Sequence, residues 1–191
     1  MMRRFPSWFG RWLQKRRAGA DKALFHHPDF GSSAATLTLS STAFGPGAVM
    51  SPIHTDDGAG LSPPLSWVGV PPDAASLVLL GEDADSPTAS PFVHLIVWGL
   101  PGADGGLDSG ALKSRGRPGA AFSLGRNGMG RCEYTPPDPP PGHGPHQYMF
   151  QVYALDRHIE FVAAPNRAQL HAAMRGHVIA KGMLTGIYER G

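Results

Sequence analysis

Three hydrophobic segments of the chain have the pattern of buried β-strands. Residues 76–81 and 92–98 are almost continuously apolar, and residues 147–155 are rich in aromatic and β-favouring side chains. Continuous apolar runs bounded by turn residues are typical of strands that are covered on both faces. A shorter segment, residues 36–41, alternates between apolar and polar positions as a half-buried strand does. The pattern therefore predicts a mainly β protein, either a sandwich or a barrel.

A basic amphipathic helix is predicted near the N-terminus, with Ser7 as its N-cap. Its apolar positions follow the spacing i, i+3, i+4, i+7, i+8, and they are Phe5, Trp8, Phe9, Trp12 and Leu13. The basic residues Arg11 and Lys15 fall on the opposite face. Such a helix either packs on its own domain or on a second subunit, as in a homodimer, or it lies on an anionic membrane surface.

A second helix is predicted near the C-terminus. Asn166 is a suitable N-cap, and the helical pattern continues to about Gly182. The apolar face would consist of Leu170, Met174, His177 and Val178. We expect a short last strand at residues 183–188 to follow it.

The remaining segments have the composition of turns and loops, because the chain contains 25 Gly and 19 Pro. Residues 18–31 are predicted to be a connector, and residues 45–61 and 99–130 to be loops. The basic side chains of the longest loop are either solvated or form a rim that steers anions, and they are Lys113, Arg115, Arg117, Arg126 and Arg131. The chain thus divides into a helical extension with a connector, residues 1–30, and one β domain, residues 31–191.

Positive charge is concentrated in the N-terminal extension. Residues 1–30 contain seven Lys and Arg against two Asp, a net charge of +5, whereas the remainder has a net charge of −3. This distribution argues against nucleic-acid binding by the β domain. A single cysteine provides no disulfide framework, and no His-Glu-x-x-His or Cys-x-x-Cys spacing indicates a metal site. The extension lacks the form of a secretory signal, and no apolar stretch is long enough to span a bilayer, so we expect a cytoplasmic protein without a cofactor.

Polar side chains occur at the ends of the predicted strands, where they are costly to bury. Asp83 and Asp85 follow the first strand, and their spacing of two would place both on one face of an extended chain. His94 lies within the second strand, and His146 and Tyr148 share a face where the third begins. Each has an ordinary explanation by itself, because histidines often pack in cores and Asp-x-Asp before proline is common in turns. Together these residues predict one shared pocket.

The chemistry available to this pocket is hydrogen bonding and proton transfer. No Gly-x-Ser-x-Gly motif and no Walker-type or dinucleotide-binding glycine motif occurs in the chain. A protonated histidine and a tyrosine hydroxyl can both donate to a phosphate or a carboxylate. The favoured function is therefore non-enzymatic binding of a small anionic ligand. The alternative is an acid–base or metal-assisted hydrolase, whose functional groups would be Asp83, Asp85, His94 and His146.

Several of these segments resemble the motifs of the phosphatidylethanolamine-binding proteins, the family that includes the Raf kinase inhibitor proteins. Residues 82–87, Glu-Asp-Ala-Asp-Ser-Pro, resemble the family's D-P-D-A-P motif, and residues 137–148 resemble its second motif, G-P-x-P-P-x-G-x-G-x-H-R-Y. Residues 62–67 resemble the segment that precedes the first motif, and residues 176–190 resemble the C-terminal ending of the bacterial branch. The motifs occur in the family's order from about Leu37 to Arg190.

This resemblance implies a two-sheet antiparallel Greek-key β-sandwich with a C-terminal helix beside a small pocket. It also implies non-enzymatic binding of a phospholipid head group or a phosphate-like anion, which in some relatives accompanies a regulatory role. The ligand-binding residues that it implies are Asp83, Asp85, Pro87, His94, Pro137, His146 and Tyr148. Four positions depart from the motifs: Ala84 replaces a proline, Ser86 replaces an alanine, Pro136 replaces a glycine, and Gln147 replaces an arginine, which removes a charge beside the pocket. No protein partner follows from these residues.

Overall fold

The computed structural model describes residues 6–31, 35–112 and 121–190. Its α-helices are α1 (Ser7–Leu13) and α2 (Arg167–Met174), and its 3₁₀ turns are η2 (Ala20–Lys22), η3 (Leu24–His26), η4 (Pro28–Phe30) and η5 (Pro52–His54). Its strands are β1 (Ala35–Thr36), β2 (Thr38–Ser40), β3 (Leu65–Val68), β4 (Ser76–Asp83), β5 (Phe92–Pro101), β6 (Gly105–Leu107), β7 (Ser123–Leu124), β8 (His146–Leu155) and β9 (Val178–Tyr188).

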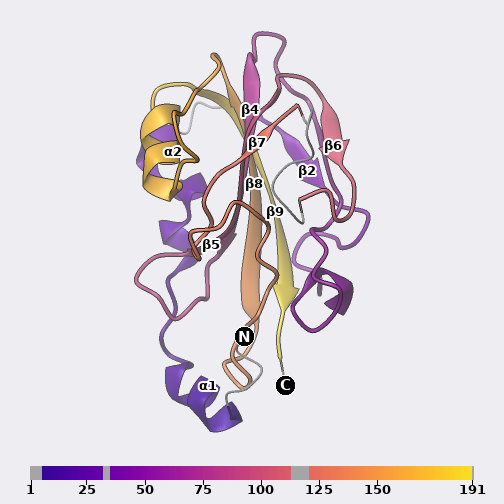
Figure 1. Cartoon of the computed structure of the whole chain (residues 1–191), viewed down its shortest axis with the longest axis vertical. Helices are drawn as coiled ribbons and strands as arrows, with labels where there is room; N and C mark the ends of the chain where they lie inside the picture. The colour runs from indigo at the N-terminus through magenta and orange to yellow at the C-terminus, as the bar shows by residue number, and fades with distance from the viewer. Residues whose placement is uncertain (1–5, 32–34, 113–120, 191) are drawn as a thin grey trace.

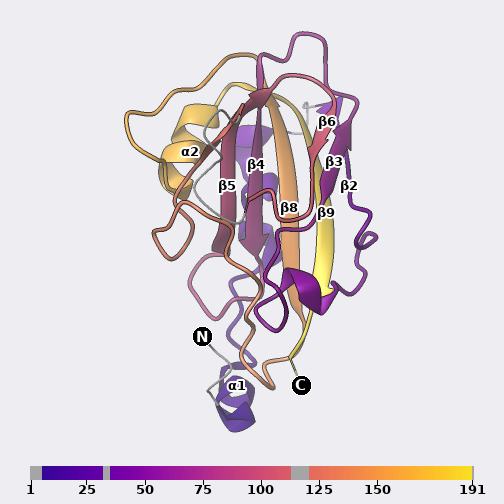
Figure 2. The same ribbon diagram turned by 45° about the vertical axis from the view of Figure 1, so that its right-hand side comes forward.

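Within the described residues, the strands form two sheets (Figures 1 and 2). The larger sheet has six strands in the order β1-β9-β8-β4-β5-β7, and the smaller has three in the order β2-β3-β6. All neighbours are antiparallel except β1 and β9, which are parallel. The prediction of a mainly β fold with two antiparallel sheets is therefore confirmed.

The long strands are apolar along their whole length because both faces of the larger sheet are covered. One face packs against the smaller sheet, and the core between them includes Leu79, Val97 and Phe150. The other face is covered by α2 and by the turns after α1, and its core includes Leu80 and Leu170. Figures 1 and 2 show α2 and the indigo N-terminal turns on one side of the sheet, and β2 and β6 on the other. A strand buried on both faces loses the apolar–polar alternation of a half-exposed one.

The C-terminal helix is shorter than the sequence pattern predicts, and the last strand is longer. The helix does begin after Asn166, whose side chain accepts a hydrogen bond from Gln169 N–H (3.0 Å) in a reciprocal capping box. It ends at Met174, and β9 already begins at Val178. The prediction of a helix to about Gly182 is wrong because residues 178–182 instead pair with β8, where a full ladder of backbone hydrogen bonds is available.

Other predicted boundaries also differ in the structure. The segment expected as one strand at residues 36–41 divides into β1 and β2, which belong to different sheets. The segment expected as a loop at residues 99–130 contains the end of β5 and the short strands β6 and β7. At the N-terminus Pro6 occupies the N-cap position, and the Ser7 hydroxyl accepts a hydrogen bond from Arg11 instead of capping the helix (3.0 Å).

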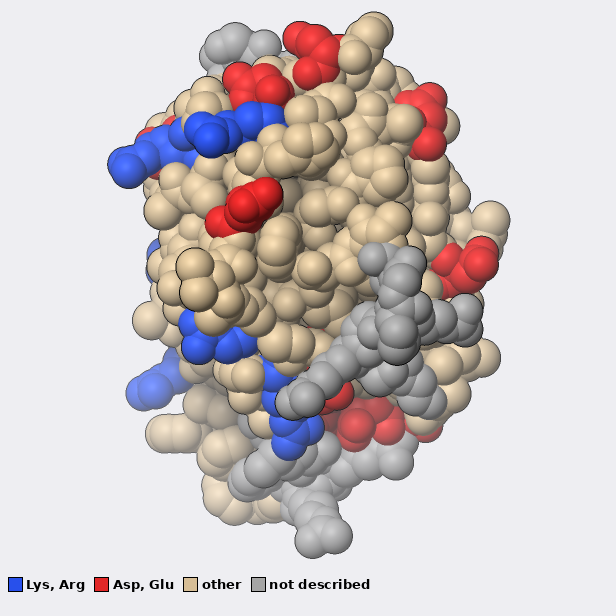
Figure 3. Space-filling model, turned by 45° about the horizontal axis from the view of Figure 1, so that its top comes forward, with Lys and Arg blue, Asp and Glu red and all other residues tan. Residues whose placement is uncertain are grey.

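Figure 3 shows a broad uncharged area, with most of the acidic side chains along its top and right and the Lys and Arg side chains along its left and lower part. Among the described residues, no helix is long and apolar enough to cross a membrane.

Candidate functional site

An acidic residue and a histidine meet where β4 ends and β8 begins. Asp83 is the last residue of β4 and pairs in register with Tyr148, while His146 is the first residue of β8. The antiparallel direction brings these strand ends together, and His146 Nδ1 lies 2.8 Å from Asp83 Oδ2. Only 1% of His146 and 5% of Asp83 is exposed. The pair is the centre of what we call the Asp83–His146 cluster, which comprises Asp83, His94, His143, His146 and Tyr148.

Two polar atoms of the cluster are buried without a hydrogen-bond partner among the described residues: His94 Nε2 and the Tyr148 hydroxyl. His94, on β5, donates from Nδ1 to the Thr135 carbonyl (2.6 Å), and its Nε2 lies 4.0 Å from Asp83 Oδ2. The Tyr148 ring packs edge-on against the His94 ring, with centroids 5.2 Å apart. Buried polar atoms are almost always paired, so two neighbouring unpaired atoms mark a position for a polar ligand or a water molecule.

Burial sets the protonation of these two groups. It lowers the pKa of His94 from its usual value of 6.5, so the imidazole is neutral near pH 7. It raises the pKa of the Tyr148 hydroxyl well above 10, so this hydroxyl remains a donor. Because the Nδ1 of His94 carries the proton that binds Thr135, its Nε2 presents a lone pair. The two rings that contact each other thus offer one donor and one acceptor, and uptake of a proton by His94 would make both groups donors.

His143 connects His146 to the N-terminal segment. Its Nε2 lies 2.9 Å from the carbonyl oxygen of Leu13 and 3.2 Å from that of Arg16, and because carbonyl oxygens only accept, this nitrogen carries a proton. Burial lowers the pKa of His143, which keeps it neutral, so its Nδ1 accepts a hydrogen bond from His146 Nε2 (2.6 Å). The other ring nitrogen of His146, Nδ1, faces the Asp83 carboxyl group.

The expectation that Asp83 and Asp85 share one face is wrong. The strand ends at Asp83, and the chain turns there, with Asp83 Oδ1 accepting a hydrogen bond from Asp85 N–H (2.8 Å). This turn breaks the alternation on which the spacing argument depended. The Asp85 carboxylate instead contacts Arg17 (2.7 Å) and Gln147 N–H (2.8 Å).

The two prolines that the family resemblance adds to the site lie in the loops that lead out of β4 and into β8. Pro87 is half-buried, and Pro137 is buried with its carbonyl accepting a hydrogen bond from Asp56 N–H (2.9 Å). Their role as ligand contacts remains a prediction.

Residues 7–19, which we call the cover segment, lie against the loops that carry the cluster. Arg17 forms the ion pair with Asp85 and also donates to the carbonyl oxygens of His143 (3.0 Å) and Pro145 (2.8 Å). One arginine side chain therefore ties together the loop after β4 and the loop before β8.

Backbone hydrogen bonds extend this contact. Ala18 N–H donates to the Ser86 carbonyl (3.0 Å), and Gly19 N–H donates to the Ala84 carbonyl (2.8 Å). The cover segment is thus docked through its side chains and its main chain, and the cluster beneath it is closed to solvent.

The helix of the cover segment packs closely on the loop before β8, at the lower end of Figure 1. Gly10 and Leu13 are buried in this contact. A Cβ atom at Gly10 would lie 2.0 Å from the Pro141 carbonyl oxygen, so only glycine permits this close approach.

The apolar stripe predicted for this helix is divided between protein and solvent. Leu13 is buried and Phe9 is half-buried, whereas Trp8 and Trp12 are 62% and 65% exposed. Phe5 lies outside the described residues.

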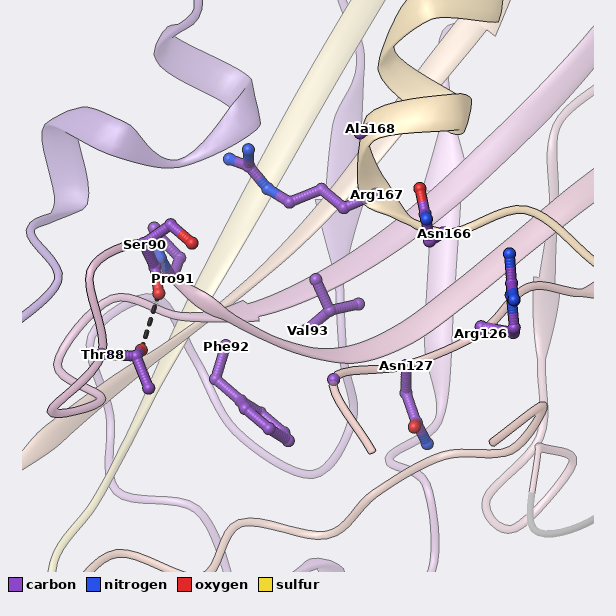
Figure 4. A pocket seen from close by; sticks show the side chains of 11 residues that line it. Thr88, Ser90, Pro91, Phe92, Val93, Arg126, Asn127, Asn166, Arg167 and Ala168 are labelled. Carbon is purple, nitrogen blue, oxygen red and sulfur yellow. Dashed lines mark hydrogen bonds between the residues drawn. The ribbon is translucent and has the colours of Figure 1, made fainter. Parts of the chain in front are cut away.

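The space next to the cluster is small. A cavity of about 10 Å³ is bordered by His94, Tyr134 and Tyr148, which is enough for about one water molecule. A larger groove of about 380 Å³ lies on the outer side of Phe92, whose ring packs edge-on against His94 with centroids 4.9 Å apart (Figure 4). The first turn of α2 borders this groove. The cavity at His94 and Tyr148 is too small for a ligand larger than a water molecule.

The structure describes only part of the basic rim that was considered for the loop at residues 99–130. Arg126 borders the groove in Figure 4 and donates to Gln169 (3.1 Å), and Arg131 is exposed beside Glu133 (3.5 Å). The other members, Lys113, Arg115 and Arg117, lie outside the described residues.

Sequence reasoning missed the two residues that connect the cluster to the cover segment, His143 and Arg17. The His143-x-x-His146 spacing was a usable signal for the first. Arg17 had no local signal, because its partners lie 68 to 128 positions away in the chain.

Comparison with known proteins identifies the family. The family model of phosphatidylethanolamine-binding proteins matches residues 40–189. A UPF0098 protein of Pyrococcus horikoshii is 38% identical over 152 residues, which cover 78% of this chain and 75% of that protein. A UPF0098 protein of Chlamydia trachomatis is 36% identical over 159 residues, which cover 81% of this chain and 99% of that protein.

Solved structures agree with this assignment. The crystal structure of a phosphatidylethanolamine-binding protein homolog from Chlamydia trachomatis has a TM-score of 0.73 and 36% identity, and it aligns over 84% of this chain and 100% of its own. E. coli YbcL, described as a member of the mammalian family, has a TM-score of 0.75 and 27% identity, over 81% of this chain and 99% of its own. The chain therefore belongs to the phosphatidylethanolamine-binding protein family.

Proposed function

We propose that the protein binds a small anionic ligand, a phosphate group or the phosphate of a lipid head group, at the Asp83–His146 cluster, without catalysing a reaction. Membership of a family of ligand-binding proteins supports binding in general. The observation that carries the specific proposal is the pair of buried, unpaired polar atoms, His94 Nε2 and the Tyr148 hydroxyl. An anion that reaches both atoms would satisfy them, and leaving them unpaired costs stability.

The charges of the cluster are compatible with this ligand. The Asp83 carboxylate would repel an anion, but it already has a hydrogen-bond partner in His146. The neutral His94 can take up a proton when the anion arrives, which turns its lone pair into a donor. Binding should therefore be coupled to the uptake of a proton.

The observations favour binding over the hydrolase alternative. That alternative uses Asp83 and Asp85 together, but the Asp85 carboxylate contacts Arg17 and the Gln147 backbone instead of the cluster. The remaining groups can all serve as hydrogen-bond donors or acceptors to a bound anion.

Replacing Tyr148 with phenylalanine is expected to weaken anion binding about tenfold. The substitution removes one hydrogen bond to a charged ligand, worth about 1.5 kcal/mol, and breaks no hydrogen bond of the free protein. Calorimetric titration with sulfate, which does not titrate near neutral pH, would measure the loss. Because His94 must gain a proton, the wild-type affinity should rise between pH 7.5 and pH 5.5.

Tyr188→Phe is the matched control, because the Tyr188 hydroxyl donates to Asp57 (2.7 Å) outside the cluster. It should keep the wild-type affinity for sulfate. Equal affinities of Tyr148→Phe and wild type, or an affinity that does not rise at low pH, would refute binding at these two atoms.

We also propose that α1 makes a peripheral contact with anionic membranes, because the exposed Trp8 and Trp12 lie among exposed basic side chains. Those basic residues are Arg11, Lys15 and Arg16. Tryptophan and basic residues together are typical of helices that lie in the lipid interface.

Vesicles that contain phosphatidylglycerol should therefore shift the tryptophan fluorescence to shorter wavelength, while phosphatidylcholine vesicles should not. Trp8→Ser together with Trp12→Ser should abolish the shift, since the two remaining tryptophans pack in the domain: Trp67 is buried and Trp98 is half-buried against the core. Unchanged vesicle binding by the double variant would rule out this contact. A dimer that dissociates in the same variant would assign the face to a second subunit instead.

A further inference from the structure

Two histidines and an aspartate converge on the surface opposite the smaller sheet, away from the Asp83–His146 cluster. His27 and Asp29 belong to η4 and its N-cap, and His171 lies on α2. Asp29 Oδ2 lies 2.9 Å from His171 Nε2 and 3.6 Å from His27 Nδ1. One ligand atom from each of the three side chains lies within 4.8 Å of the others.

The negative charge of Asp29 has no lysine or arginine beside it among the described residues. Its ion-pair partners there are His27 and His171. A cation is the ligand that would balance this charge.

We propose that His27, Asp29 and His171 form a binding site for a divalent transition-metal ion such as Zn²⁺, Co²⁺ or Ni²⁺. Imidazole nitrogens and a carboxylate oxygen are ligands that these ions prefer, and three protein ligands leave the remaining positions to water. All three side chains are partly accessible, with 39%, 29% and 23% of the side chain exposed, so an ion can reach them from solvent.

The site is partly preorganised. His27 Nδ1 accepts a hydrogen bond from Asp29 N–H (3.2 Å), so this nitrogen already carries the lone pair that a metal ion needs. The rings of His27 and His171 lie against each other with centroids 4.2 Å apart, and Phe30 packs edge-on against His171. Binding would exchange the long hydrogen bond at His27 and the proton of His171 Nε2 for bonds to the ion.

A bound ion would join two parts of the fold that are distant in sequence. It would tie η4, which lies before the family-matching region of residues 40–189, to α2, which borders the groove of Figure 4. The N-terminal extension would then be held to the domain by a metal ion as well as by the contacts of the cover segment.

The test is titration of the full-length, tag-free protein with Zn²⁺ by calorimetry, alongside melting temperatures with and without the ion. We expect one ion per chain, a melting temperature that rises with Zn²⁺, and at least about tenfold weaker binding in Asp29→Asn and in His171→Gln. His177→Gln is the matched control, because His177 and Asp156 form a pair of the same length (2.9 Å) without a second histidine. The control should bind like wild type.

The proposal fails if the protein shows no saturable Zn²⁺ binding. It also fails if binding persists unchanged in both site variants, or is lost only when Cys132 or a histidine of the Asp83–His146 cluster is replaced. Circular dichroism of each variant would establish that it is folded, and His27→Gln, in the exposed η4 cap, provides a third variant that leaves α2 untouched.

Discussion

Deletion of residues 1–17 is expected to increase the affinity of the Asp83–His146 cluster for sulfate on the order of 30-fold. The cover segment docks on the cluster through Arg17 and through the carbonyls that hold His143, and the cavity at His94 and Tyr148 has room for about one water molecule, so we propose that the segment moves when a larger ligand enters. If the closed state is favoured by about 2 kcal/mol, only a few per cent of the molecules are open, and the apparent affinity falls by the same factor. Calorimetric titration of the truncated and full-length proteins would measure the gain.

A matched control leaves the cover in place while changing its charge. Arg11 and Lys15 are exposed, and replacing both with glutamine removes two of the six positive charges of residues 1–17 without breaking the ion pair to Asp85. This variant should bind sulfate as the wild type does. An affinity that falls on truncation would mean that Arg17 attracts the anion and does not compete with it.

Arg167→Ala is expected to destabilise the protein by about 3 kcal/mol, measured by urea unfolding. Glu82 is 1% exposed, and its carboxylate accepts hydrogen bonds from Arg167, Gln151 (2.8 Å) and Leu24 N–H (2.8 Å). Removing the arginine leaves a buried negative charge without its cation, which lowers the free energy of unfolding far more than the loss of a surface ion pair does.

Arg175→Ala is the control for this substitution, because Arg175 follows the same helix but is exposed. It should change the free energy of unfolding by less than about 0.5 kcal/mol. Equal effects of the two substitutions would show that the Glu82–Arg167 pair does not stabilise the fold.

The central strands could be predicted because their signal is local. Residues 76–81 and 92–98 are almost continuously apolar and residues 147–155 are rich in β-favouring side chains, and the structure places them in β4, β5 and β8 at the middle of the larger sheet. The antiparallel register of these strands then brought Asp83, His94, His146 and Tyr148 together, as their positions at strand ends predicted.

The remaining features depended on contacts that the local pattern does not contain. Residues 178–182 have spacings that a helix could use, but pairing with β8 decides their conformation. The Asp85 carboxylate lies outside the cluster because the chain turns after Asp83, where Asp83 Oδ1 accepts a hydrogen bond from Asp85 N–H. The docking of Arg17 joins residues more than sixty positions apart, and no periodicity predicts such a contact.

Arg17 belongs to the same chain as the domain on which it docks, and this covalent link affects the binding equilibrium of the cluster. The cover segment is a tethered competitor, so its effective concentration at the cluster is set by the short connector and not by the amount of protein, and for such linkers it is of millimolar order. A free ligand must therefore outcompete a local partner that cannot diffuse away. Dilution of the protein does not relieve this competition, whereas a change in the connector or in Asp85 would reset the ligand concentration at which the cluster fills.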